Sequence, residues 1–461
     1  MGGRARKGTI TRRFLLQGGT AAGAALALGK VAGCSKDDPE PPPNRRPNVI
    51  VVLADDMRYD ELPFLPNVTS LLVDEGVSFS AARHNISLCS PARAGFLTGQ
   101  YSMRHQVRSQ ADAFGAASNQ HKTVAVWMQD AGYTTGLIGK YLAGGNRFAP
   151  GWDTKRQLAE NPQNQEGFTV WDGAQETTPS VDQTRYLSDE VTLFLESAPE
   201  PFFLWFTPTA NHWPIEPPPG HEDDVASLEW PDDSEEDVSD KPPWIQSLPP
   251  VGEEHLRMAR AYQRGRVREL LGLDDTIGSM VQALKDRGSL DNTVVMFSSD
   301  NGVFAGEHRL PLLSKNMPYD PSVRVPCLIR APGLAAGVVT QPAHMAIDLT
   351  ATCVAVADAH PDLELDGTSL LEIAGNPSRY DERGLLYDRD DRDNGTAFDC
   401  PPAAGVFTAT RKLIRYETTP PTFELYDLEH DPDELTNVAD DPTYTSQRTA
   451  LEAELDGLLS S

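Results

Sequence analysis

Long apolar runs alternate with amphipathic segments through most of this chain. Uninterrupted apolar runs cover residues 47–54, 201–206 and 293–297, and residues 133–140 form a further strand-like segment that ends on a lysine. Runs of this kind are typical of strands buried on both faces of a parallel sheet. Helical spacing of apolar residues fills the intervals at 65–76, 123–131 and 254–287. The alternation predicts a doubly wound α/β core.

The pattern changes after about residue 374. A strand over 323–329 still belongs to the core, but the later strand-like pieces are short and lie at 384–387, 405–415 and 423–428. An amphipathic helix over 444–459 ends the chain. We therefore expect a core domain over residues 47–374 and a smaller C-terminal α+β subdomain over residues 375–461, which holds an antiparallel sheet and one helix.

Composition places the chain among globular proteins and narrows its partners. It has 461 residues, of which 39% are hydrophobic and 23% charged, and its net charge is −27. A chain this acidic is not expected to bind nucleic acid nonspecifically. An anionic substrate would have to be drawn by a local cluster of positive side chains.

The first 46 residues have the pattern of an export signal and a tether. Arg12 and Arg13 form a twin-arginine pattern, an apolar run follows over 18–28, and Cys34 ends a lipoprotein-like cleavage box. We expect residues 1–33 to be a signal peptide for the twin-arginine route and 34–46 to be a polar, proline-rich linker. The protein would then lie outside the cytoplasm at a bacterial cell surface, in contact with a membrane only through a lipid on Cys34. The alternative is a disordered basic tail.

Polar side chains with a common chemistry follow the predicted strands. The carboxylates and one amide are Asp55, Asp56, Asp300 and Asn301, and the cationic or titratable groups are Lys140, His212 and Lys315. Carboxylate and amide oxygens are ligands that suit Ca²⁺ or Mg²⁺. The lysines suit an oxyanion, and the histidine suits proton transfer. Taken singly, each of these residues is as well explained as an ordinary polar loop residue.

Residues 89–93, with the sequence Cys-Ser-Pro-Ala-Arg, predict a helix that begins at Cys89. Pro91 suits a first helical turn, and Arg93 falls one turn after Cys89 on the same face. This geometry favours an anion beside a reactive side chain. A buried structural thiol is the competing interpretation, and a disulfide stays open. The remaining thiols, Cys327, Cys353 and Cys400, form no disulfide scaffold, although one bridge among them is possible.

In their order along the chain these motifs resemble the type I sulfatases of the alkaline-phosphatase-like superfamily. The resemblance runs from about residue 47 to residue 459 and is carried by segments 47–56, 89–93, 98–101, 139–142, 211–214, 299–302, 306–308 and 423–435. Segment 139–142, with the sequence Gly-Lys-Tyr-Leu, is closest to the glucosamine-6-sulfatase branch. The resemblance implies an alkaline-phosphatase-like mixed-sheet core.

The resemblance also implies a chemistry. Cys89 would be oxidised to formylglycine by the formylglycine-generating enzyme, and Ca²⁺, or Mg²⁺, would be held by Asp55, Asp56, residue 89, Asp300 and Asn301. Hydrated formylglycine would attack sulfur in a sulfate monoester of a sugar or an aryl alcohol, and His212 would protonate the departing alcohol. Arg93, Lys140 and Lys315 would stabilise charge on the sulfuryl oxygens.

One position departs from the arylsulfatase pattern. Many arylsulfatases carry a second catalytic histidine two residues after the lysine, and this chain has Leu142 there. His105 and His308 are candidates for that missing acid–base role. Two rival functions remain open: a phosphate or phosphonate monoester hydrolase of the same superfamily, and a non-catalytic lipoprotein that binds glycans and keeps its thiol at position 89.

Overall fold

A computed structural model describes residues 46–460, apart from residue 113 and segments 115–118, 143–146, 160–163, 229–236 and 391–399. The twin-arginine pattern and Cys34 lie outside the described residues, so the signal peptide, the linker and the lipid anchor stay predictions. The described part forms one compact unit. Within it, no helix has both the length and the apolar character that crossing a membrane requires.

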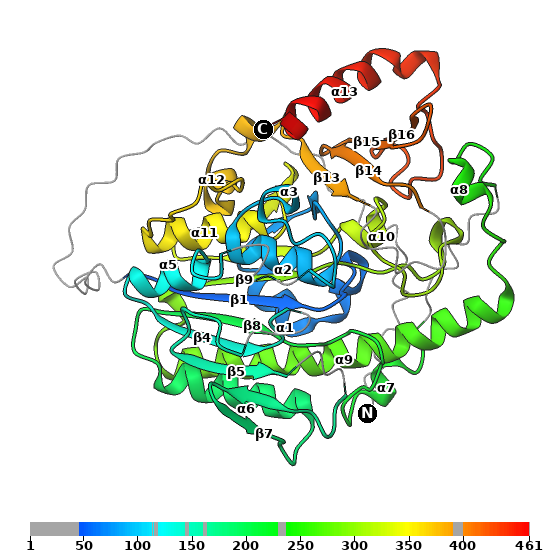
Figure 1. Cartoon of the computed structure of the whole chain (residues 1–461). Coiled ribbons are helices and arrows are strands. Elements are labelled where there is room, and N and C mark those ends of the chain that lie inside the picture. The colour runs from blue at the N-terminus through cyan, green and yellow to red at the C-terminus, as the bar shows by residue number, and fades with distance from the viewer. Residues whose placement is uncertain are drawn as a thin grey trace, which may run out of the picture. The chain divides into compact units, whose positions relative to one another are not determined.

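The core is a single mixed sheet whose strands run in the order β11-β2-β10-β9-β1-β8-β4-β5-β6-β7 (Figure 1). Its strands are β1 (Asn48–Ala54), β2 (Val77–Phe79), β4 (Thr134–Gly139), β5 (Thr154–Leu158), β6 (Val170–Asp172), β7 (Gln175–Thr177), β8 (Phe202–Thr207), β9 (Thr293–Ser299), β10 (Cys327–Arg330) and β11 (Gly337–Val339). The central strands β9, β1, β8, β4 and β5 are parallel, whereas β10 runs antiparallel to β9. The predicted mixed, doubly wound core is confirmed.

Helices cover both faces of this sheet (Figure 1). One face is covered by α2 (Cys89–Thr98), α5 (Val124–Asp130), α11 (Ile347–Ala357) and α12 (Leu370–Gly375), and the other by α1 (Pro66–Val68), the π-turn Thr69–Val73, α6 (Gln183–Ser197) and α9 (Glu253–Asp286). All seven residues of β1 are buried: Val49 and Val51 point to the first layer, and Ile50 and Val52 to the second. Burial on both faces is the reason that this strand is apolar at consecutive positions.

The C-terminal subdomain has the predicted architecture. Strands β13 (Leu385–Arg389), β14 (Ala403–Phe407), β15 (Arg411–Tyr416) and β16 (Thr422–Asp427) form an antiparallel sheet in chain order, and α13 (Thr445–Ser460) packs on one face of it. The opposite face packs on core segments that include Tyr319, whose hydroxyl donates to Glu424 at 2.9 Å. This contact fastens the subdomain to the loop that follows β9.

Two predicted strands have different extents in the structure. The segment predicted over 323–329 is a strand only from Cys327, because the short helix α10 (Asp320–Val323), with Pro321 in its first turn, ends at Val323 and residues 324–326 connect it to the strand. The segment predicted over 405–415 spans two strands of a hairpin, β14 and β15, joined at residues 408–410. Other short elements are β3 (Ala82–Arg83) paired with β12 (Ala343–His344), and α3 (Ser102–His105), α7 (Glu222–Val225) and α8 (Pro243–Gln246).

Candidate active site

The predicted polar residues meet at one edge of the sheet because four parallel strands end there. Asp55 follows β1, Asp300 follows β9 and Lys140 follows β4, while His212 lies five residues after the end of β8. Helix α2 begins at Cys89 beside the same edge. The carboxyl ends of parallel strands are where open α/β sheets bind ligands. The polar residues that follow the predicted strands therefore lie together in the structure.

Cys89 is the first residue of α2 and is 1% exposed. Its Sγ lies 3.6 Å from Oδ1 of Asp55, and the Nζ of Lys315 donates to it at 3.1 Å. Burial raises the pKa of the Cys89 thiol to about 12, although Lys140 and Lys315 act in the opposite direction. A thiol with this pKa stays protonated near neutrality and is a poor nucleophile.

The other thiols take no part in this site. Cys327, Cys353 and Cys400 are buried and, like Cys89, each is a free cysteine. The disulfide that the sequence left open among them is therefore not formed in the described part of the chain.

Carboxylates of the two adjacent aspartates face Cys89 from the end of β1. One ligand atom each from Asp55, Asp56, Cys89 and His212 lies within 4.8 Å of the others. Burial alone would raise the pKa values of Asp55 and Asp56. Nearby positive charges, mainly Lys140 for Asp55 and Lys315 for Asp56, outweigh burial, so the pKa of each aspartate is lowered. Burial and the neighbouring Asp55 raise the pKa of Asp300 to about 6.

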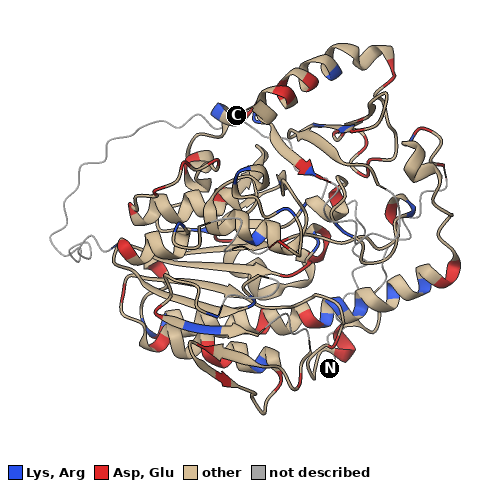
Figure 2. Cartoon of the chain, in the orientation of Figure 1, with Lys and Arg blue, Asp and Glu red and all other residues tan. Residues whose placement is uncertain are grey.

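Three cations are interleaved with these carboxylates. The Nζ of Lys140 donates to Asp55 at 2.5 Å, the Nζ of Lys315 to Asp56 at 2.5 Å, and the Nε of Arg93 to Asp300 at 2.7 Å. Elsewhere acidic residues are spread over many helices and loops (Figure 2). The site thus interleaves three cationic side chains with three carboxylates, and a bound divalent cation would give it the net positive charge that attracts an anion.

The site has oxygen atoms that could serve as ligands of a hard divalent cation. Asn301 donates from Nδ2 to Asp56 at 2.5 Å, whereas its Oδ1 is buried and has no hydrogen-bond partner among the described residues. A buried carbonyl oxygen without a partner is energetically costly, and a cation would satisfy it. Together with Asp55, Asp56 and Asp300 it makes a set of oxygen ligands typical of Ca²⁺ or Mg²⁺ sites.

His212 faces this cluster from the loop after β8. Its Nε2 lies 3.7 Å from Oδ2 of Asp56, and its Nδ1 is 2.5 Å from the carbonyl oxygen of Trp213. An Nδ1–H donated to that carbonyl leaves Nε2 directed at the carboxylates. Burial lowers the pKa of His212, with Asp56 and Asp55 acting against the shift. The imidazole is placed to exchange a proton with a group bound at the cluster.

The two histidines proposed for a second acid–base role are poorly suited to it. His308 stacks on Tyr319 with ring centroids 4.1 Å apart, and the Nδ1 of His105 accepts from the backbone N–H of Val107 at 3.1 Å. Burial lowers the pKa of each to about 3, so both stay neutral near pH 7. Leu142 lies in the apolar core beside β4.

A buried ion pair behind the cluster was not predicted. The guanidinium of Arg266, from the middle of α9, donates to the carbonyl of Asp56 at 2.8 Å, to that of Asn211 at 3.1 Å and to both carboxylate oxygens of Glu61 at 2.9 Å. Asp56 has a positive φ of 68°, which is uncommon for residues other than glycine, and Arg266 holds its carbonyl in that conformation. The sequence did hold one signal for this ion pair: Arg266 is a charged residue at a core-facing position of the helix, seven residues after the buried Ala259.

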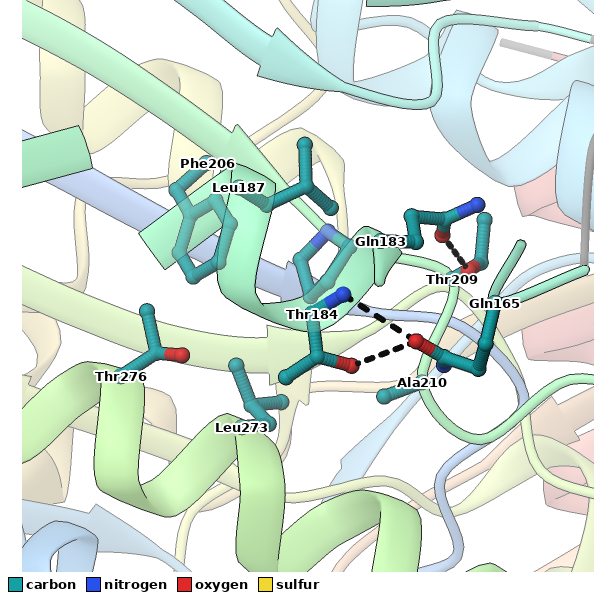
Figure 3. A pocket seen from close by; sticks show the side chains of 10 residues that line it. Gln165, Gln183, Thr184, Leu187, Phe206, Thr209, Ala210, Leu273 and Thr276 are labelled. Atoms are coloured by element: carbon teal, nitrogen blue, oxygen red, sulfur yellow. Dashed lines mark hydrogen bonds between the residues drawn. The ribbon is translucent and has the colours of Figure 1, made fainter. Parts of the chain in front are cut away.

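A separate small pocket lies between β8, α6 and α9 (Figure 3). Its polar lining is internally bonded: Thr209 donates to Gln183, and Gln165 accepts from the backbone and the hydroxyl of Thr184, each at 3.1 Å. None of the predicted site residues lines it. The Thr209–Gln183 bond braces the segment that leads from β8 to His212.

The family of the chain follows from comparison with known proteins. Residues 47–359 match the family described as Sulfatase, and residues 306–460 match the one described as N-sulphoglucosamine sulphohydrolase, C-terminal. The first match covers more than half of the chain, so the chain belongs to the sulfatase family.

Curated relatives are distant in sequence. The chain is 28% identical over 354 residues to the extracellular sulfatase SULF-1 homolog of Drosophila melanogaster, covering 71% of this chain but 31% of that protein. It is 27% identical over 471 residues to human N-acetylglucosamine-6-sulfatase, covering 90% of this chain and 85% of the relative. The chain therefore spans about a third of the first relative and most of the second.

Solved structures share the fold. A protein solved in complex with its substrate D-glucosamine-2-N,6-O-disulfate has a TM-score of 0.78 and 21% identity, over 90% of this chain and 98% of that one. The phosphonate monoester hydrolase of Agrobacterium radiobacter has a TM-score of 0.69 and 22% identity, and the match covers 90% of this chain and 96% of that one. At these identities the likeness establishes the fold, and it spans both the core and the C-terminal subdomain.

Proposed function

We propose that this protein hydrolyses the sulfate monoester of a sulfated sugar, with formylglycine at position 89 and a calcium ion, or magnesium, at the carboxylate cluster. One observation carries the proposal. A buried Cys89, at the start of a helix, lies 3.6 Å from Asp55 and 3.1 Å from the ammonium group of Lys315. Neither a structural thiol nor a thiolate nucleophile needs both an acidic ligand set and a set of cations around it.

The chemistry at position 89 requires more than a thiol. Once oxidised and hydrated, formylglycine would supply two hydroxyls on one carbon, one to attack sulfur and one whose deprotonation releases sulfate. The divalent cation would supply Lewis acidity beside that residue, held by Asp55, Asp56, Asp300 and Asn301. The raised pKa of the unmodified thiol supports the view that Cys89 is a precursor.

The remaining side chains would bind the substrate and move its proton. Lys140, Lys315 and Arg93 are positioned to stabilise negative charge on sulfuryl oxygens, because their donors converge on the carboxylates that surround Cys89. His212, once it carries a proton on the Nε2 that faces Asp56, would protonate the oxygen of the departing alcohol. The backbone of the Asp56 loop is kept in place by Arg266.

A sulfated amino sugar is the substrate class we favour. Support comes from the curated relatives that are N-acetylglucosamine-6-sulfatases and from the structural neighbour bound to a sulfated glucosamine. The proposal includes maturation by a formylglycine-generating enzyme, export by the twin-arginine route and a lipid on Cys34.

Hydrolysis of a phosphate or phosphonate monoester is the second candidate, because the chain shares its fold with a phosphonate monoester hydrolase. The two functions separate in kinetics. Protein co-produced with a formylglycine-generating enzyme is assayed on 4-nitrophenyl sulfate, 4-nitrophenyl phosphate and N-acetylglucosamine 6-sulfate. We expect kcat/KM to favour the sulfates, and a preference for phosphate by orders of magnitude would favour the second candidate.

Cys89→Ala is the matched control in this assay. It cannot be matured, so we expect no turnover of any substrate, and activity in this variant would place the nucleophile elsewhere. A non-catalytic glycan-binding protein would instead give no turnover with either protein and would retain the thiol at position 89.

A further inference from the structure

Trp213 is an exposed aromatic side chain beside the catalytic cluster. It is 53% exposed, it directly follows His212, and its Nε1 donates to the hydroxyl of Tyr262 at 2.7 Å. Most large apolar side chains in this protein are buried, and a solvent-exposed indole has no need of a fixed orientation. A hydrogen-bonded, exposed indole at this place is typical of a binding surface.

Tyr262 lies on the part of α9 that passes between two loops of the site. On one side, the loop after β8 packs along the helix, with the N–H of Glu216 donating to Glu269 at 2.7 Å. Nearer the N-terminal end of α9, the loop after β9 is joined to the helix, where the N–H of Leu312 donates to His255 at 3.2 Å. These loops carry His212 and Lys315. The part of α9 between these two contacts therefore lies next to the loops that carry the site residues.

The distance from this face to the cluster is short. Tyr262 precedes Arg266 by about one helical turn, roughly 5.4 Å along the axis. Arg266 in turn contacts the carbonyl of Asp56 at 2.8 Å. Met258, one turn before Tyr262, is 45% exposed and extends the apolar surface outward. We call Trp213, Tyr262 and Met258 the aromatic shelf.

The size and chemistry of the shelf fit a single sugar ring. One aromatic side chain buries about 150–250 Å² when covered, whereas a stable protein interface needs about 800 Å² per partner. A second protein is therefore a poor match for a surface made of one half-exposed indole and one thioether. A pyranose ring has an apolar C–H face of suitable size and polar groups around its rim, which the indole face and the Tyr262 hydroxyl complement.

We propose that the aromatic shelf binds the pyranose ring that carries the sulfate, with the indole of Trp213 stacked on its C–H face. This inference rests on the proposed function and adds the recognition of the alcohol portion of the substrate. The sulfate group is bound at the cluster, and the shelf orients the sugar so that its ester oxygen faces His212. Sulfate esters without a sugar ring would lack the binding contribution of stacking on Trp213.

Binding to a protein that cannot turn over tests the shelf directly. In full-length Cys89→Ala protein, calorimetry compares N-acetylglucosamine 6-sulfate with inorganic sulfate. Adding Trp213→Ala should weaken sugar binding about tenfold, the scale of one favourable aromatic contact, and leave inorganic sulfate binding unchanged. Trp213→Phe should retain most of the affinity. Leu193→Ala, which removes another exposed apolar side chain from α6, is the control and should change neither.

Each outcome decides the inference. Unchanged sugar affinity in Trp213→Ala, equal losses for sugar and inorganic sulfate, or no sugar binding by the parent would each overturn it. The proposed function fails separately, if matured wild-type protein releases no sulfate. If sugar binding depends on Trp213 but the protein has no sulfatase activity, the aromatic shelf is supported and the proposed hydrolase function is contradicted.

Discussion

Replacing Arg266 with alanine removes one partner of a buried ion pair behind the carboxylate cluster. Arg266 is 1% exposed and Glu61 is fully buried, and two parallel hydrogen bonds of 2.9 Å join them. Breaking a buried pair by deleting one partner costs about 3–5 kcal/mol, because the remaining charge is left uncompensated. The backbone carbonyls of Asp56 and Asn211 lose a donor as well.

Urea unfolding of the wild type and Arg266→Ala measures this cost. Arg257→Ala on the same helix is the control, because Arg257 and Glu254 form an exposed pair 3.8 Å apart, and such pairs contribute roughly 0–1 kcal/mol. The double variant Glu61→Gln/Arg266→Met should recover part of the loss, since it leaves no buried charge without a partner.

The same variant should affect the metal site. Groups that orient metal ligands typically contribute 10–100-fold in metal affinity or activity, and Arg266 holds the carbonyl of Asp56. We expect Arg266→Ala to bind Ca²⁺ more weakly than Arg257→Ala at a temperature where both are folded. A loss of stability no larger than that of the control, with unchanged Ca²⁺ affinity, would refute the reasoning.

Two further predictions concern other buried carboxylates. Asp300→Ala removes a proposed ligand and the partner of Arg93, so metal content and turnover should be lost together, and metal analysis that finds unchanged content would remove Asp300 from the site. Burial raises the pKa of Glu269 to about 8 from an ordinary 4.5, so the folded state keeps a proton that the unfolded chain has released, and stability should fall as pH rises between these values. Glu269→Gln should flatten that dependence in urea unfolding at pH values of about 5 and about 8, and an unchanged slope would contradict it.

The sheet and most of the site could be predicted because they depend on local patterns. The apolar run of β1 indicated a strand buried on both faces, and the polar residues that follow β1, β4 and β9 had to meet where parallel strands end. The helix start at Cys89 was visible from Pro91. The cluster therefore followed from strand ends without knowledge of tertiary contacts.

What the sequence did not indicate depends on contacts between distant segments. Arg266 is bound to Glu61, 205 residues away, and an amphipathic helix alone does not show which buried position carries a charge. His308 was a candidate for catalysis until its stack on Tyr319 showed a buried, neutral ring. Helix α6 also went unpredicted: of its fifteen residues only five are buried, so its apolar stripe is narrow.

The central claim is that residue 89 works as formylglycine and not as a thiol. Mass spectrometry of the tryptic peptide spanning residues 84–93, from protein produced in its native host, tests it most directly. We predict that this peptide has the mass of the formylglycine form and that the same preparation releases sulfate from a sulfated sugar. A peptide that retains the Cys89 thiol in fully active protein would contradict the account.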